Sequence, residues 1–330
     1  MPDENTNFTA AYTTDDQAKV AFIVTWLRAD SNRTNADLFR KSGDINAATG
    51  SQILNGKYIS SPTEYLQRMI AAIQDSEDRK AIKSEIPFVE TSIYKFIEQI
   101  CRRTHLDKDI GICIGNPGVG KTISLRHFAK IKSNVVLLEA FADITHKSFL
   151  LELCSLTGIS HEGNPAVNLQ NFFKRSEYSL IIDEADELPT ASIKFARRLS
   201  DIAGIGVLLV GNDELHVKLK DPLGRLGKIN SRIGFHPKAI KLVKYRDCKL
   251  MVESYLGQSV STEIAKAFYQ TSEGSGRLLR NLLRNTSRKA AKDNVVITTA
   301  LIAKVNEESM AGRDIKMNVP EPTPEELKGG

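Results

Sequence analysis

The 330-residue sequence lacks any run of 18 or more apolar residues, the length that a membrane-spanning helix needs. Its first 16 residues are polar and acidic, unlike a secretory or transit peptide. Cysteine is scarce, and the four cysteines form no C-x-x-C pair and have no histidine cluster nearby: Cys101, Cys113, Cys154 and Cys248. These absences exclude the common zinc-site spacings and a membrane span. They favour free thiols in a reducing compartment, so we expect a cytoplasmic or nucleoid-associated protein.

Charge is unevenly distributed along the chain. The formal net charge is +5, and the apolar and charged fractions of 41% and 26% are ordinary for a globular protein. Residues 241–310 carry 12 Lys and Arg against 7 Asp and Glu, whereas residues 1–75 carry 7 against 9. The basic surplus in the C-terminal third favours phosphate-bearing partners there.

The length predicts more than one domain. We expect a disordered lead over residues 1–15, an all-helical domain over 16–74, a charge-dense linker over 75–87 and an α/β domain over 88–240. A helical domain over 241–310 and a loose, proline-containing tail over 311–330 follow.

Within residues 88–240, short apolar runs alternate with helical patterns. The runs cover residues 110–114, 135–138, 180–182 and 206–210. Continuous apolar strands separated by helices are typical of a parallel sheet that is covered on both faces. The fold class that this predicts is α/β.

One glycine-rich segment fits the phosphate-binding pattern G-x-x-x-x-G-K-[ST]. It consists of Gly115, Asn116, Pro117, Gly118, Val119, Gly120, Lys121 and Thr122. A strand pattern precedes it and a helical pattern follows it, which is the context that the motif requires. Backbone N–H groups and the helix start would surround the β-phosphate, and Lys121 would reach the β- and γ-phosphates. Because the Thr122 hydroxyl would ligate Mg²⁺, we expect a site for ATP and magnesium.

Two further strand patterns end in polar side chains. Asp183 and Glu184 follow the run 180–182, and there Asp183 would hold the magnesium ligand shell while Glu184 polarises the attacking water. A solvated strand end is the alternative for this pair. Asn212 follows the run 206–210 and would orient water at the γ-phosphate, unless it only forms a turn. A glutamate beside the aspartate favours hydrolysis over binding alone.

The order of these motifs resembles the AAA+ superfamily, and more closely the phage Mu B and TnsC-like family of transposition ATPases. The resemblance covers nearly the whole chain. It includes residues 55–58, 88–91, 115–122, 181–186, 211–212, 231–233 and 273–278. It implies an AAA+ P-loop core over 88–240 with a helical lid over 241–310, preceded by a helix-turn-helix-like domain.

By this resemblance, Asn212 and Arg277 take the two sensor roles, and Arg232 is the arginine finger that acts on a neighbour's ATP. Arg225 is the competing finger, and an ordinary surface arginine is the alternative for both. A finger supplied in trans would tie hydrolysis to assembly. The resemblance also implies double-stranded DNA and a transposase as partners, a homo-oligomer such as a helical filament, and a bacterial, phage or mobile-element origin.

The N-terminal domain offers one candidate DNA surface. Residues 35–42 and 47–55 would be the two helices of a helix-turn-helix, of which the second would enter the major groove. The residues that would contact DNA are Thr49, Ser51 and Gln52 at bases and Lys57 and Tyr58 at the backbone. Gly50 lies where an apolar residue is usual and Phe39 where a small one is usual, and the domain is net acidic. A protein-docking module is therefore the alternative.

The C-terminal helical domain offers a second surface. Arg277, Arg280, Arg284 and Arg288 fall on one helical face. Arg277 would turn inward to nucleotide, and Arg280 and Arg284 would meet DNA phosphates or a transposase unless the face is merely solvated. His146, Lys147 and the loop 157–164 are further candidates for contact with DNA in the core.

Three functions are compatible with these patterns. The first is an ATP-dependent DNA-binding regulator of transposition, which oligomerises on target DNA, recruits and activates a transposase, and is released by hydrolysis. The second is a helicase loader or replication-initiation ATPase. The third is an ATP-switched transcriptional regulator with a helix-turn-helix head. We favour the first because the resemblance extends into the N-terminal domain and the linker.

Overall fold

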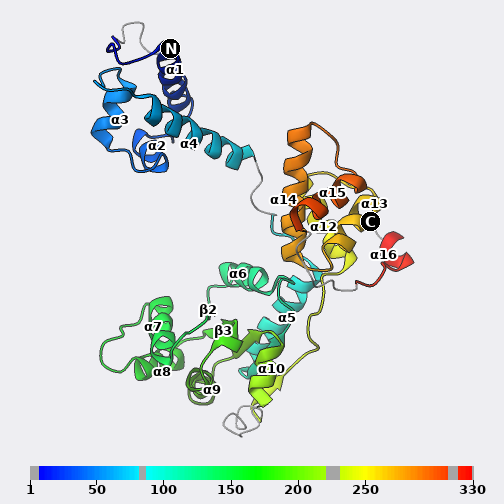
Figure 1. The fold of residues 1–330 in the computed structure, drawn as a ribbon. Helices are drawn as coiled ribbons and strands as arrows, with labels where there is room; N and C mark the ends of the chain where they lie inside the picture. The colour runs from blue at the N-terminus through cyan, green and yellow to red at the C-terminus, as the bar shows by residue number, and fades with distance from the viewer. Residues whose placement is uncertain (1–6, 82–86, 221–230, 311–318, 329–330) are drawn as a thin grey trace. The chain divides into compact units, whose positions relative to one another are not determined.

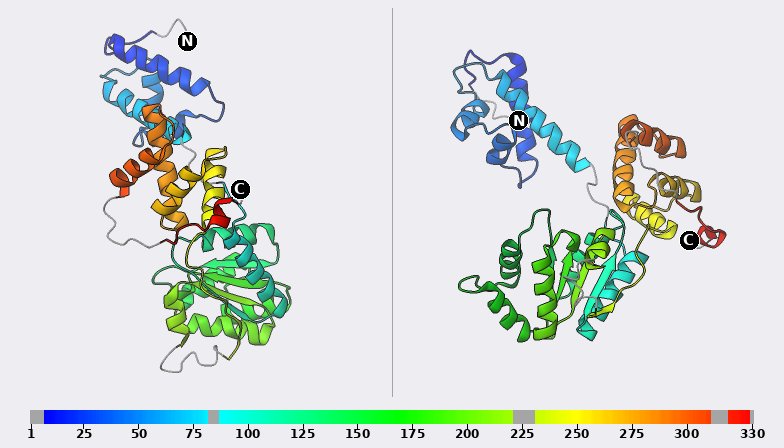
Figure 2. Two further views of the ribbon diagram at one scale, coloured as in Figure 1. Left: turned by 90° about the vertical axis from the view of Figure 1, so that its right-hand side faces the viewer. Right: turned by 60° about the horizontal axis from the view of Figure 1, so that its bottom comes forward.

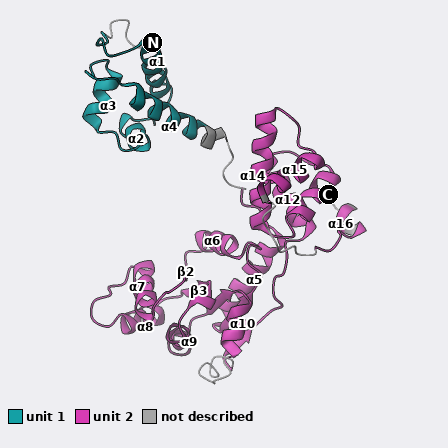
Figure 3. Cartoon of the chain, viewed as in Figure 1, with its two compact units in different colours: residues 1–84 teal, residues 85–330 magenta. Residues whose placement is uncertain are grey.

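A computed structural model describes residues 7–81, 87–220, 231–310 and 319–328 of the chain (Figure 1). The chain divides into two compact units, Met1–Ser84 and Glu85–Gly330 (Figure 3). Within the described ranges, no helix is both long enough and apolar enough to cross a membrane.

The first unit is helical. Its elements are α1 (Thr14–Arg28), α2 (Asn35–Lys41), α3 (Ala47–Leu54) and α4 (Thr63–Ala81). A capping box starts α1, because the Thr13 side chain accepts from the Asp16 backbone and the Asp16 side chain accepts from the Thr13 backbone. The predicted helices 35–42 and 47–55 correspond to α2 and α3 to within one residue.

The first unit extends further at both ends than the sequence predicted. The prediction of a disordered lead over residues 1–15 is wrong for the described part of that segment. Tyr12 is only 7% exposed, and its hydroxyl donates to the Ile53 carbonyl at 3.0 Å. The prediction of a linker over residues 75–87 is wrong for the start of that segment, because α4 continues to Ala81. Glu77 holds this turn of α4 to the unit, since its Oε1 accepts from Trp26 Nε1 at 2.8 Å and from Arg33 at 3.0 Å. Residues 82–86 of the predicted linker lie outside the described residues.

A small residue faces a large one between α2 and α3. Gly50 and Phe39 are both buried. A Cβ on Gly50 would stand 2.6–2.7 Å from three atoms of the Phe39 ring. The two departures from the usual helix-turn-helix pattern therefore compensate each other, because the ring fills the space that the missing side chain leaves.

The second unit is built on a parallel sheet with the strand order β2-β3-β4-β1-β5. The strands are β1 (Ile110–Ile114), β2 (Val135–Glu139), β3 (Ser179–Asp183), β4 (Val207–Gly211) and β5 (Ile233–Phe235). Successive side chains of β3 enter opposite cores, with Ile182 in one and Ile181 in the other. Helices cover both faces of the sheet (Figure 2), so the predicted α/β class is confirmed.

The four predicted apolar runs are β1 to β4, and β5 is the strand that the sequence pattern missed. β5 has only three residues, and Ile233 and Phe235 in it are only half-buried. The Arg103 guanidinium covers the Phe235 ring at 4.1 Å from the ring centroid. A short edge strand that is shielded by a cation has no apolar run to reveal it.

The helices of the second unit fall into two groups along the chain. Those that accompany the sheet are α5 (Ser92–Asp107), α6 (Lys121–Ile131), α7 (His146–Thr157), α8 (Pro165–Lys174), the short 3₁₀ helix η1 (Ala185–Glu187), α9 (Thr190–Ala203) and α10 (Asp213–Lys220). Those in the region predicted as the lid are α12 (Tyr245–Leu256), α13 (Thr262–Thr271), α14 (Gly276–Asp293) and α15 (Thr299–Met310).

The described part of the C-terminal tail is packed, which corrects the prediction of a loose tail over 311–330. Val319 and Leu327 pack against the second core, and α16 (Pro324–Lys328) is helical. Glu321 pairs with Lys266 of α13 at 2.6 Å and accepts from Gln270 at 2.7 Å. Apolar contacts and this pair offset the low helical propensity of the prolines. Residues 311–318 and 329–330 lie outside the described residues.

The Gly50–Phe39 contact predicts that replacing a helical glycine by alanine, which usually raises stability, lowers it here. Alanine forms helix better than glycine by about 1 kcal/mol, but a methyl group forced into a packed core costs about 1–3 kcal/mol. We therefore expect Gly50→Ala to lower the unfolding midpoint of the first unit. Phe39→Leu in the same chain should restore it partly.

Trp26 is the one tryptophan of the sequence and lies in α1, so its fluorescence reports on this unit within the full chain. Ser51→Ala, on the exposed side of α3, is the matched control and should change the free energy of unfolding by no more than about 0.5 kcal/mol. A Gly50→Ala midpoint at or above that of the wild type would contradict the packing argument.

Candidate functional site

The carboxyl ends of neighbouring strands bring the predicted site residues to one edge of the sheet. β1 leads into Gly115, β3 ends at Asp183, and β4 ends one residue before Asn212. The register pairs Ile114 with Gly211 across β1 and β4. Because the strands are parallel, these ends meet at the same edge, where α/β sheets bind ligands.

The glycine-rich loop lies between β1 and α6, and hydrogen bonds to residues 240 and 241 and within the loop hold its backbone. Gly118 and Gly120 have φ of +79° and +106°, a region that favours glycine. The backbone N–H of Asn116 donates to the Ile240 carbonyl at 2.8 Å, and its side chain donates to the Lys241 carbonyl at 2.9 Å. Lys121 is 7% exposed, and its Nζ lies 2.7 Å from the Gly115 carbonyl oxygen. The loop thus holds a buried cation beside the backbone amides at the start of α6.

Thr122 and Asp183 form an oxygen pair that suits magnesium. The Thr122 hydroxyl donates to Asp183 Oδ2 at 2.6 Å. Asp183 is fully buried, and this burial raises its pKa above the ordinary value, although Thr122, the Glu184 N–H and Lys121 oppose the rise. A hydroxyl and a carboxylate oxygen are ligands that Mg²⁺ accepts, and a cation there would relieve the buried charge. The donor set therefore fits the ion that the sequence predicted.

Glu184 directly follows β3 in a left-handed conformation, with φ 50° and ψ 40°. Its backbone N–H donates to Asp183 Oδ1 at 3.0 Å. Burial raises the pKa of Glu184, the charges of Asp183 and Asp186 raise it further, and those of Lys121 and Arg277 oppose the rise. A half-buried carboxylate with a raised pKa is a better proton acceptor, as polarising a water requires.

Asn212 lies where the sequence predicted, but its amide is held by a residue to which the sequence assigned no role. Asn212 Nδ2 donates to Asp186 Oδ2 at 3.0 Å, and its Oδ1 accepts from the Glu214 N–H at 2.6 Å. Asp186 is 8% exposed. The one available sequence signal is a third carboxylate shortly after β3, which is too common a pattern to single it out.

The start of α14 touches the glycine-rich loop. The Arg277 backbone N–H donates to the Gly118 carbonyl at 3.1 Å. A Cβ on Gly118 would stand 2.8 Å from Oγ of Ser275, the residue that caps α14. The charge of Arg277 also opposes the rise in the Glu184 pKa, which ties its guanidinium to this site. The lid therefore presents a helix N-terminus and a cation to the phosphate loop.

The segment before α5 contacts α6, the helix that follows the glycine-rich loop, and the first residue of α5 contacts the lid. Phe88 stacks on His127 of α6, with ring centroids 3.6 Å apart and planes 8° apart. The backbone N–H and hydroxyl of Ser92 donate to the Asp247 carboxylate of α12 at 2.7 Å and 2.6 Å. None of these contacts could be predicted from the sequence, because each joins residues far apart in the chain.

Arg232 lies outside the cluster around the loop. Its side chain is 63% exposed, and its Nε is 3.4 Å from Asp201 Oδ1 on α9. An exposed ion pair of this kind is weak, about 0–1 kcal/mol, so it leaves the guanidinium able to change partner. The finger role of Arg232 stays a prediction, and the competing Arg225 lies outside the described residues.

The residues predicted to contact DNA differ in exposure. The exposed ones are Ser51, Gln52 and Lys57 in the first unit and Lys147 in the second. The less accessible ones, which are half-buried, are Thr49, Tyr58, Arg280 and Arg284. His146 packs inward, with its Nδ1 3.1 Å from the Ser192 hydroxyl. It is therefore a poor candidate for a phosphate contact.

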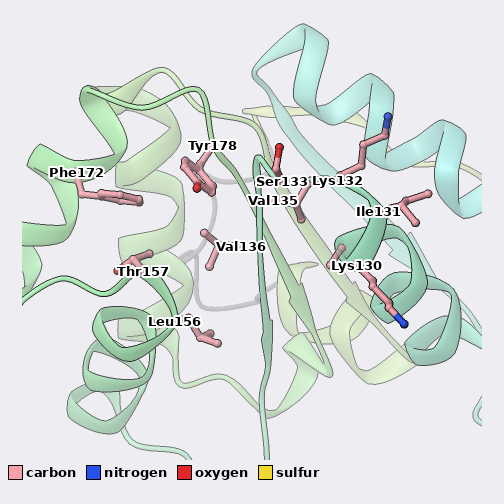
Figure 4. Close-up of a pocket in the computed structure, with 11 residues that line it drawn as sticks. Lys130, Ile131, Lys132, Ser133, Val135, Val136, Leu156, Thr157, Phe172 and Tyr178 are labelled. Atoms are coloured by element: carbon pink, nitrogen blue, oxygen red, sulfur yellow. The ribbon is translucent and has the colours of Figure 1, made fainter.

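A hollow of about 480 Å³ lies at the opposite end of the sheet from the glycine-rich loop. Its walls include Val136, Phe172 and Tyr178, while the amine of Lys130 extends away from it (Figure 4). Because no catalytic side chain lines it, we assign it no part in the site.

Comparison with known proteins places this site in a class. A family model described as an AAA domain matches residues 103–219. The chain is 28% identical over 263 residues to the Mu-like prophage FluMu DNA transposition protein B of Haemophilus influenzae, covering 76% of this chain and 89% of that protein. It is 26% identical over 249 residues to the ATP-dependent target DNA activator B of Escherichia phage Mu, covering 73% and 79%.

A solved structure, the RuvB Holliday junction branch migration motor of Thermotoga maritima, is also similar, with 17% identity and a TM-score of 0.43. It covers 65% of this chain and 67% of its own.

The parallel sheet, the glycine-rich loop and the AAA-domain match together define an AAA+ P-loop ATPase fold. Within that class, the chain is similar to the B transposition proteins of Mu-like phages. The resemblance that the motifs predicted is confirmed.

The contact between Gly118 and Ser275 predicts a selective loss of nucleotide affinity. Gly118→Ala would introduce a Cβ against Oγ of Ser275 and strain a positive φ. We expect the affinity for ATP to fall at least about tenfold, roughly 1.4 kcal/mol, because the loop and the lid can no longer approach. Titration with a fluorescent ATP analogue measures this.

Gly163→Ala is the matched control. Gly163 also has a positive φ, +74°, but an added Cβ there would meet nothing within 4 Å. It should lower stability without changing ATP affinity. Equal effects of the two substitutions on ATP affinity would show that backbone strain, and not the lid contact, is responsible.

Proposed function

We propose that this chain is an ATP-dependent, DNA-binding regulator of DNA transposition. In this proposal it oligomerises on double-stranded target DNA while ATP is bound, recruits and activates a transposase, and is released when ATP is hydrolysed. The observation that carries the proposal is the contact of α14 with the phosphate loop in a relative of the phage B transposition proteins. The phage and prophage origin of those relatives supports a site of action on bacterial nucleoid DNA.

The geometry supports a separate role for each group of site residues in ATP hydrolysis. The loop amides and Lys121 would bind the β- and γ-phosphates, and Thr122 and Asp183 would hold magnesium. The ion would neutralise phosphate charge when bound. Glu184 would take a proton from the attacking water, while Asn212 donates a hydrogen bond on the γ-phosphate side.

Coupling to DNA would pass through the lid and through subunit contacts. The Arg277 backbone N–H binds α14 to the loop at the Gly118 carbonyl. A change at the terminal phosphate would therefore change how the lid packs on the loop. Arg232 would act on a neighbour's ATP, and ATP between subunits would then favour the oligomer by mass action. An oligomer that brings many weak DNA contacts together binds far more tightly than one subunit.

The DNA contacts that we propose are basic or polar and exposed. Ser51 and Gln52 lie on the exposed side of α3, followed by Lys57, and Lys147 lies in the first turn of α7. Arg280 and Arg284 on α14 would contribute through the parts of their side chains that are not buried. The basic residues among them would contact the DNA backbone, and such contacts make affinity salt-dependent and only weakly sequence-selective.

The test of the proposal is the coupling between nucleotide and DNA. Lys121→Ala removes the cation that would reach the phosphates, so we expect it to abolish both ATP binding and the ATP-dependent part of DNA binding. Fluorescence anisotropy of a labelled duplex at fixed salt, with ATP, a slowly hydrolysed analogue or ADP, measures this.

Lys130→Ala is the control for this test, because Lys130 is an exposed lysine of the same helix. It should behave as the wild type does. DNA binding by Lys121→Ala that still responds to ATP would refute the proposed coupling.

The trans role of Arg232 predicts an effect that depends on mixing. Arg232→Ala subunits mixed with wild type should lower ATPase activity more than in proportion to their fraction, because each would disable a neighbour's site. Arg198→Ala, at an exposed arginine of α9, is the control and should dilute activity no more than proportionally. A strictly proportional decline with Arg232→Ala would exclude it as a trans finger.

A further inference from the structure

Asp186 is a buried carboxylate that forms no salt bridge with any other described residue, yet both of its oxygens accept hydrogen bonds. Oδ1 accepts from the Asn212 backbone N–H at 3.2 Å, and Oδ2 accepts from Asn212 Nδ2 at 3.0 Å. A buried carboxylate needs donors to offset its desolvation. Asn212 supplies two, so one residue satisfies Asp186 and is held by it in return.

This arrangement fixes which way the Asn212 amide faces. The Asp186 carboxylate can only accept, so it requires the NH₂ end of the amide. The Glu214 backbone N–H can only donate, and at 2.6 Å it requires the oxygen end. The amide cannot turn over without losing both bonds. The second N–H of Nδ2 has no acceptor among the described residues and is a donor of the kind that an anionic phosphate needs.

The turn that carries Asp186 is itself held in place. Lys218 of α10 donates to the backbone carbonyls of Asp186 and, at 2.9 Å, of Leu188. Gly211 leaves the carboxylate room, because a Cβ there would overlap Asp186 Oδ1. The end of β4, the 3₁₀ turn after β3 and α10 therefore meet at this carboxylate.

We propose that Asp186 is a positioning residue, which fixes the Asn212 amide so that its remaining N–H serves the terminal phosphate of ATP. Asp186 acts through Asn212 and does not itself contact the nucleotide. The proposal rests on the nucleotide-hydrolysing part of the proposed function, and it does not depend on DNA or transposase. Lys218 supports the same geometry from α10.

A double-mutant cycle tests this proposal. Asp186→Asn keeps the size of the side chain but presents an amide that no longer requires the NH₂ end of Asn212. We expect kcat for ATP to fall about tenfold to hundredfold with a smaller rise in KM, as for loss of an orienting partner of the terminal phosphate. In an Asn212→Ala background, Asp186→Asn should have no further effect on kcat, because nothing is left to orient.

The ratio of ADP to ATP dissociation constants is a second readout that needs no turnover. Asp186→Asn and Asn212→Ala should lower this ratio by similar factors, and the double variant no further. Glu187→Gln removes an exposed carboxylate from the same turn and is the control, which should leave both readouts unchanged. Lys218→Met should shift both in the same direction as Asp186→Asn, by a smaller factor.

Three outcomes would overturn the proposal: an unchanged kcat and affinity ratio in Asp186→Asn, effects of the two substitutions that multiply in the double variant, or a fall in thermal stability with no change in kcat. A wild type that hydrolyses ATP but binds DNA equally well in ATP and ADP would refute the proposed function and leave the cycle valid. A wild type that binds ATP without turnover would also refute that function, and the affinity ratio would then decide the role of Asp186.

Discussion

The hydrogen bond from the Arg277 N–H to the Gly118 carbonyl is the contact on which the rest of the site depends. It brings the N-terminus of α14 and the Arg277 guanidinium to the phosphate loop, so the nucleotide site is shared between the sheet and the lid. Gly118 permits this approach by a positive φ and by the absence of a Cβ. A triphosphate bound between the two parts would be sensed by both, which is the physical basis for an ATP-dependent change in the protein.

The same edge of the sheet connects outward by two further contacts. The Phe88–His127 stack attaches the segment before α5 to α6, and the hydrogen bonds from Ser92 to Asp247 attach the start of α5 to the lid. That segment leads back to the N-terminal unit along the chain. The chain that follows the first unit is thus attached, at Phe88 and Ser92, both to α6 and to the lid.

The parts that sequence reasoning predicted correctly are those fixed by local patterns. The four apolar runs became β1 to β4 because buried parallel strands must be apolar throughout, and the glycine-rich loop lies between β1 and α6 as its flanking patterns predicted. β5 was missed because Arg103 shields a short strand, and the packed tail because one ion pair and two apolar side chains hold it. The contacts of Asp186, on which its proposed role rests, were not predictable, since they arise where β4, the 3₁₀ turn and α10 meet. In the first unit, Gly50 and Phe39 each departed from the expected pattern, and only their contact shows that the departures compensate.

Hydrogen exchange of the backbone amides tests most directly whether the loop and the lid respond to nucleotide as one site. The segments to follow are residues 115–122 and 275–279, in the full chain with ATP analogue, with ADP and without nucleotide. The account predicts that the ATP analogue slows exchange in both segments together and that ADP protects the lid segment less. Protection of the loop by ATP with unchanged exchange at residues 275–279 would contradict it.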